Sequence, residues 1–174
     1  MTSNNKIQML SKILAHICYG LLFILPIVSF SMWLKVDWFP IFFNDQYDAS
    51  TFDIRTQAFG IVFSLLPLSI WMYGLFNLRQ LFRNYAAGLV FSFENAAYIK
   101  RFAWMSIIGG GLSPFFGAGF SLILSMNHAK GERFLQIGLG TTEIHIMLLG
   151  FVFVIIAHIM EAAHKLSEEN NQFV

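Results

Sequence analysis

Charged residues divide this chain into four long uncharged stretches. No Asp, Glu, Lys or Arg occurs in 13–34, 56–78, 102–129 or 144–160. A helix needs about 20 apolar residues to cross a hydrocarbon core of roughly 30 Å, and the first three stretches meet this length. The fourth is shorter, but its apolar run continues past Glu161, and polar groups near the end of a span can reach the interface. The pattern predicts an all-α membrane bundle of four transmembrane helices forming one domain over residues 1–174, with spans at about 13–34, 58–78, 102–125 and 144–164.

Composition agrees with this class. Of the 174 residues, 56% are apolar and 12% are charged, whereas a soluble domain carries about 25% charged residues. The net charge is only +1, so no basic surface argues for direct binding of nucleic acid. Cys18 is the single cysteine, so the chain cannot form an intrachain disulfide. We interpret Cys18 as a small apolar residue of the first span.

The distribution of Lys and Arg predicts the orientation. Seven of the 11 lie on the side of the two termini: Lys6, Lys12, Arg79, Arg83, Lys100, Arg101 and Lys165. The other side holds four, Lys35, Arg55, Lys130 and Arg133, and most of the aspartates. Cytoplasmic loops are enriched in Lys and Arg, so both termini are expected in the cytoplasm. On the opposite side, Trp33, Trp38 and Phe39 predict an aromatic belt at the interface.

The connection between spans two and three has its own organisation. The helix of span two is expected to continue beyond the membrane as far as Gly88, a natural left-handed stop. Ser92 can then cap a new helix whose first turn holds Glu94. This hairpin tip, with Gly88, Ser92, Glu94 and Asn95, is a candidate partner-binding site.

Span three is rich in glycine and also contains a proline: Gly109, Gly110, Gly111, Pro114, Gly117 and Gly119. Such a run can be a broken helix that lines a site. It can equally be a thin face that lets helices pack closely through small residues four apart, such as Gly117 and Ser121. Glycine is common in membrane helices generally, which favours the packing interpretation.

Ionisable residues inside a span are costly and therefore mark candidate functional positions. His16 lies near the terminal side of span one, and His158 and Glu161 lie near the same side of span four. The three are expected to meet at one depth as a polar cluster. Two histidines and a carboxylate are permissible zinc ligands, although the spacing is not that of a zinc protease. A protonation switch is a second interpretation. The simplest one is that Glu161 pairs with Lys165, His158 forms a hydrogen bond within the bundle and His16 lies at the interface.

Two stretches carry a resemblance to a known family. They are 81–95, from Leu81 to Asn95, and 161–170, from Glu161 to Asn170. Together with Ile99 and the glycines of span three, they resemble the bacterial membrane family catalogued as domain of unknown function 2975. The resemblance implies a multi-pass protein of the bacterial cytoplasmic (inner) membrane, without established enzymatic activity. It also implies a partner, because such proteins often accompany a small helix-turn-helix regulator. The ending Asn171-Gln172-Phe173-Val174 departs from the aspartate and β-branched pair usual in the family.

Three functions follow as hypotheses. The first is a non-enzymatic membrane partner or sensor that acts with a cytoplasmic regulator through the tip and the acidic tail. The second is a small transporter or channel subunit, which would need a homo-oligomer because four spans without an internal repeat make a poor transporter. The third, an intramembrane enzyme, depends on the metal interpretation. No Ser-His-Asp set, phosphate loop or dinucleotide fingerprint occurs in the sequence, so neither a catalytic residue nor a cofactor is expected.

Overall fold

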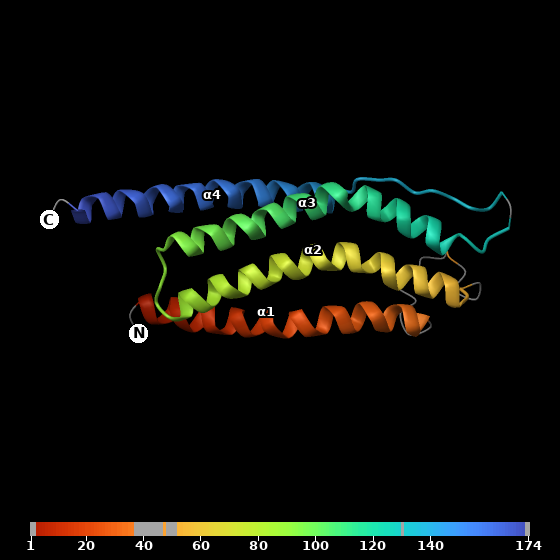
Figure 1. Ribbon diagram of the computed structural model, residues 1–174, viewed down its shortest axis with the longest axis horizontal. Helices are drawn as coiled ribbons and strands as arrows, with labels where there is room; N and C mark the ends of the chain where they lie inside the picture. Colours follow the sequence, from red (N-terminus) through yellow and green to blue (C-terminus); the bar gives the residue numbers. More distant parts are fainter. Residues whose placement is uncertain (1–2, 37–46, 48–51, 130, 173–174) are drawn as a thin grey trace.

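The computed structural model describes residues 3–36, 47, 52–129 and 131–172, and these form four long helices (Figure 1). Helix α1 covers Ser3–Leu34, α2 covers Ile54–Ala86, α3 covers Phe93–Leu124 and α4 covers Thr141–Gln172. Each of the four is long and apolar enough to cross a membrane. The predicted all-α class with four spans is therefore confirmed, and every helix continues beyond its predicted span.

The four helices lie side by side in chain order, with α1 and α4 at the two edges (Figure 1). The extensive contacts join α1 to α2, α2 to α3 and α3 to α4. Both termini lie at one end of the row, together with the α2–α3 connection; we call this the terminal end. The opposite end, which carries the α1–α2 and α3–α4 connections, is the distal end. The row is thus open, because α1 does not pack along α4.

Small residues stand where neighbouring helices approach most closely. A Cβ added at Gly74 on α2 would lie 3.3 Å from the Cβ of Met105 on α3. One added at Gly150 on α4 would lie 3.0 Å from the carbonyl oxygen of Ala103 on α3. Between lipid-facing helices there is little hydrophobic driving force, so close backbone packing supplies much of the association energy. Glycine at these positions permits that approach.

Trp33 joins α1 to α2 at the distal end. Its side chain is only 1% exposed, lies against Gly60 and donates a hydrogen bond from Nε1 to Ser64 Oγ at 2.8 Å. The expectation that Trp33 belongs to an aromatic interface belt is therefore wrong, because an indole whose N–H finds a buried acceptor is better placed inside the protein. Trp38 and Phe39, the other residues of that expected belt, lie outside the described residues.

Helix α3 is continuous through its glycines and through Pro114. Both α2 and α3 change direction near their middles in Figure 1, and each contains a proline, Pro67 in α2 and Pro114 in α3. Proline removes one helical hydrogen bond and bends a helix, and it is tolerated in membranes where neighbours re-satisfy the backbone. The glycine run is thus a packing surface rather than a break, and Gly119, for example, lies against the ring of Phe63.

Replacing Gly60 by valine tests the Trp33 contact. The added side chain occupies the space of the indole ring, so Gly60→Val is expected to destabilise the protein by about 1–3 kcal/mol through overpacking. Thermal unfolding of the purified protein in mild detergent measures this. Gly20→Val is the matched control, since a Cβ at Gly20 on α1 meets nothing within 4 Å. Equal melting temperatures for the two variants would contradict this account of the α1–α2 interface.

Candidate functional site

Helix α4 begins beside the middle of α3. The Ser113 hydroxyl donates a hydrogen bond to Glu143 Oε1 at 3.3 Å, and a Cβ at Gly110 would lie 3.1 Å from the Glu143 carbonyl oxygen. The end of α3 at Leu124 lies 11 residues beyond Ser113, which is about 16 Å at 1.5 Å per residue. The distal half of α3 therefore has no α4 beside it.

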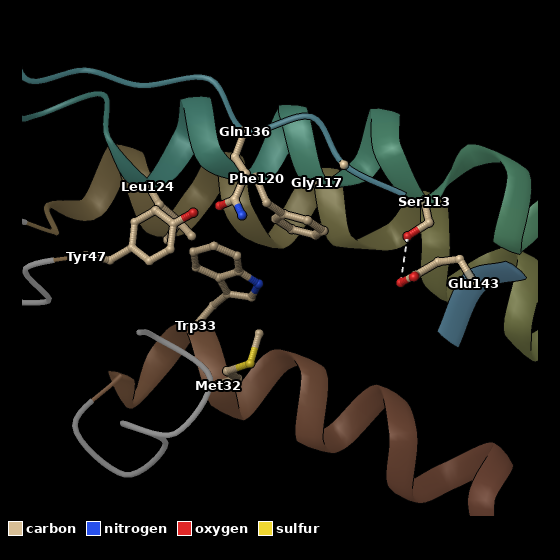
Figure 2. Close-up of a pocket in the computed structure, with 10 residues that line it drawn as sticks. Met32, Trp33, Tyr47, Ser113, Gly117, Phe120, Leu124, Gln136 and Glu143 are labelled. Carbon is tan, nitrogen blue, oxygen red and sulfur yellow. Dashed lines mark hydrogen bonds between the residues drawn. The ribbon is translucent and has the colours of Figure 1, made fainter. Parts of the chain in front are cut away.

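An extended segment, residues 132–140, covers that part of α3 instead (Figure 2). The Gln136 N–H donates to Ser121 Oγ at 2.9 Å, and the Phe134 N–H donates to Ser125 Oγ at 3.4 Å. Gly117 lies one turn from Ser121, and a Cβ there would be 3.8 Å from the Gln136 carbonyl oxygen. The small residues Gly117 and Ser121 were expected to face another helix. They contact the extended segment instead, and the Ser121 hydroxyl accepts a hydrogen bond from its backbone.

This arrangement places Glu143 at membrane depth. Ser113 lies 12 residues along α3 from Arg101, the last charged residue before the uncharged stretch, which corresponds to about 18 Å. Counted along α4 from Glu161, which pairs with Lys100 beside Arg101, Glu143 lies 18 residues or about 27 Å away. In a hydrocarbon core about 30 Å thick, the two counts place Glu143 on the distal side, between about 3 and 12 Å from the boundary. Irregular backbone is tolerated at such depth where it is covered by protein or lines a water-filled cavity.

A cavity of about 410 Å³ lies between the extended segment, α1, α3 and the start of α4 (Figure 2). Its volume is within the range of small-molecule sites, about 300–1,000 Å³. Aromatic and apolar side chains dominate its walls, and Ser113, Gln136 and Glu143 supply polar groups. The ten lining residues are Met32, Trp33, Tyr47, Ser113, Gly117, Phe120, Leu124, Gln136, Gly138 and Glu143.

The residues expected to form one polar cluster at the terminal end are separated. His16 lies on α1 and its Nδ1 is 2.7 Å from the Lys12 carbonyl oxygen, whereas His158 and Glu161 lie on α4 at the opposite edge of the row. The expectation that the three meet is wrong, because it required α1 to pack against α4. No group of three His, Cys, Asp or Glu side chains suited to a metal ion occurs in the described ranges.

Glu161 instead forms an ion pair with Lys100 of α3. Lys100 Nζ lies 3.4 Å from Glu161 Oε1, with the two side chains 35% and 21% exposed. The expected partner was Lys165, one turn away on the same helix. His158 is exposed, and its Nδ1 lies 2.8 Å from the Val154 carbonyl oxygen of its own helix. The ion pair therefore connects α3 to α4, whereas His158 lies at the surface and contacts the backbone of its own helix.

The tip between α2 and α3 is organised by Asn95. Its fully buried side chain donates to the carbonyl oxygens of Leu89 and Val90 at 2.6 and 3.1 Å and accepts from Asn84 at 2.8 Å. As expected, Ser92 caps α3, its hydroxyl accepting from the Asn95 N–H at 3.2 Å. Gly88 adopts the left-handed conformation with a φ of 86°, as a C-terminal stop requires. Of the four predicted tip residues, Glu94 and Gly88 are exposed, whereas Asn95 is available to no partner.

Comparison with known proteins identifies the family to which the chain belongs. The family model described as "Protein of unknown function (DUF2975)" matches residues 19–174. The chain belongs to this family. No curated protein matches it, and no solved structure does. Family membership and the four apolar helices together indicate a multi-pass membrane protein.

Two features of this family member escaped the sequence analysis. The first is Glu143, an acidic residue in the first turn of α4, where a carboxylate complements the helix dipole. The register of α4 against α3 puts it inside the membrane, and this register depends on contacts at Gly110 and Ser113. The second feature is the set of exposed apolar side chains at the tip, Leu89, Phe91 and Phe93. In the sequence, the apolar residues 89–91 lie between the helix-stop residue Gly88 and the cap residue Ser92. That pattern could have predicted an apolar surface at the tip.

Removing the Ser121 hydroxyl tests how the extended segment is held. Ser121→Ala leaves the Gln136 N–H without its acceptor near the membrane boundary, at a cost of about 1–3 kcal/mol. We expect a lower melting temperature and faster hydrogen exchange at the Gln136 amide. Ser69→Ala is the matched control, because Ser69 Oγ donates only to the Leu66 carbonyl oxygen of its own helix. Unchanged exchange at Gln136 in Ser121→Ala would show that the segment is held by other contacts.

Proposed function

We propose that this protein is a non-enzymatic membrane component of a regulatory pair, which binds a cytoplasmic regulator through the tip between α2 and α3. The observation that carries the proposal is the apolar surface of this tip. Leu89, Phe91 and Phe93 are 61%, 79% and 54% exposed. Exposed apolar groups gathered beyond the membrane-spanning part of a protein are typical of interaction sites.

The rigidity of the tip supports a role in binding. The three hydrogen bonds of the Asn95 side chain hold the loop from Asn84 to Val90 in one conformation. A surface that is already ordered loses little conformational entropy when a partner binds. The apolar side chains therefore stand on a preformed support, as a docking site requires.

The charge distribution supports a cytoplasmic location for the tip. Seven of the 11 Lys and Arg residues belong to the terminal end, and cytoplasmic segments are enriched in these residues. A bacterial inner-membrane location and a helix-turn-helix partner are proposals that rest on the family resemblance. In this arrangement the regulator approaches from the cytoplasm and meets the tip first.

Labelling of single cysteines tests the orientation. In a Cys18→Ser background, Glu94→Cys places a thiol on the exposed tip and Glu132→Cys places one at the distal end, where Glu132 is exposed. A membrane-impermeant maleimide applied to spheroplasts is expected to label Glu132→Cys at once and Glu94→Cys only after permeabilisation. The reverse pattern would place the tip outside the cell and remove the proposed route to a cytoplasmic partner.

Binding of the regulator tests the partner itself. Any helix-turn-helix protein found to be encoded beside this chain is purified and titrated against the full chain in mild detergent. Phe91→Ser is expected to weaken binding at least about ten-fold, because a large exposed aromatic residue is a typical interface anchor. Leu135→Ser is the control, since Leu135 is 54% exposed at the distal end. Equal binding by both variants would exclude the tip as the docking site, and the lack of any such neighbouring gene would oppose this partner class.

A transporter or channel subunit remains the second candidate function. The observation in its favour is Glu143, a carboxylate that borders a cavity at membrane depth. Because the helices form an open row, a pathway across the membrane would need several copies of the chain. Flux measured in proteoliposomes separates this function from the regulatory one.

A further inference from the structure

We infer that the distal cavity is a binding site for a small organic ammonium ion with an apolar body. The inference goes beyond the proposed function, since it concerns the opposite end of the molecule. It stands on four observations: the position of Glu143 on the distal side, its unfilled hydrogen-bonding capacity, the absence of basic residues from the described lining of the cavity, and the aromatic walls of the cavity.

Glu143 carries a carboxylate that its neighbours only partly satisfy. An ionised carboxylate can accept about four hydrogen bonds. Ser113 Oγ supplies one at 3.3 Å, and the described residues offer Glu143 neither a second side-chain donor nor an ion-pair partner. The position in the first turn of α4 adds the favourable helix dipole. This leaves the carboxylate able to accept further donors from within the cavity (Figure 2).

The residues around Glu143 favour binding of a cation over an anion. Among the described residues that line the cavity, none is Lys, Arg or His. A negative charge on the distal side of a hydrocarbon core is costly without a counter-charge. A cation entering the cavity would supply that counter-charge, whereas an anion would be repelled.

The aromatic and apolar walls of the cavity favour a cation that carries apolar groups. Phe120 and Tyr47 are partly buried rings on the lining, and Trp33 forms a buried wall stacked on Phe120 with 6.2 Å between ring centroids. Aromatic faces attract ammonium groups, and rings together with a carboxylate bind quaternary ammonium ions in many proteins. Gln136 adds an amide that can orient a polar substituent (Figure 2). A strongly hydrated inorganic cation would gain little from such walls.

Access from water follows from the backbone of the extended segment. Residues 137–139 lie outside the helices, although they run beside the distal part of α3. Such backbone is tolerated beside a water-filled cavity. The ligand can therefore arrive from the distal aqueous phase, or it can be the amine of a lipid headgroup that reaches in from the distal leaflet.

Calorimetry with benzyltrimethylammonium tests the inference. The full chain is reconstituted in nanodiscs of phosphatidylglycerol, which has no ammonium group. Saturable binding of one cation per chain is expected. Glu143→Gln, which keeps the shape of the side chain, is expected to bind at least about ten-fold more weakly. Glu132→Gln, an exposed distal carboxylate outside the cavity lining, is the control and should bind as the parent does.

Three results would overturn the inference: no saturable binding by the parent chain, equal affinity in Glu143→Gln, or full displacement of the cation by its uncharged isostere neopentylbenzene. The last would reveal an apolar site without charge selection. If Glu143→Gln does not fold, Phe120→Leu decides the question. That change keeps apolar volume but removes the ring face, so a drop of about three-fold or more in affinity is expected, and unchanged affinity opposes the inference.

A second lipid separates the two sources of the ligand. In nanodiscs that contain phosphatidylethanolamine, weaker apparent binding of the probe supports the site with a headgroup amine as its occupant. Equal binding in both lipids supports a soluble ammonium ion. Because none of these measurements includes the regulator, their failure would leave the proposed function of the tip untouched.

Discussion

The position at which α4 begins decides most of what is distinctive in this protein. Close approach at Gly110 and the hydrogen bond from Ser113 to Glu143 set the start of α4 beside the middle of α3. The chain must therefore return along the distal half of α3 without a helix. Backbone groups at membrane depth need partners, and the hydroxyls of Ser121 and Ser125 supply some of them. The cavity is the space that remains between this segment, α3 and Trp33 of α1.

The two ends of the molecule differ in the way they are built. At the terminal end, helices continue beyond the membrane, and a buried asparagine holds a compact tip that presents apolar side chains. At the distal end, helices stop early and an irregular segment borders an aromatic and acidic cavity. The proposed regulator and the proposed ammonium ligand therefore use opposite ends. Helices α3 and α4 connect the two, through Ser113–Glu143 at one level and Lys100–Glu161 at another.

Local signals in the sequence succeeded where the physics is local. The Ser92 cap, the left-handed Gly88 and the continuation of α2 beyond the membrane each depend on a few consecutive residues, and each was predicted. The site predictions failed where they needed a helix arrangement. The cluster of His16, His158 and Glu161 assumed that α1 packs against α4, and Trp33 was taken for an interface residue. Both errors concern which helix faces which, and apolar composition carries little information about that because every face of these helices is apolar.

The sequence by itself determined the class of this protein: four membrane-spanning helices, the boundaries of the tip and membership of the DUF2975 family. Uncharged length and capping residues are sufficient for these, because the bilayer requires each span to satisfy its own backbone. Only the tertiary structure decided the open row, the pairing of Lys100 with Glu161 and the depth of Glu143. These depend on the register between helices. Register is set by contacts of glycine and serine with residues far away in the chain, so no local pattern encodes it.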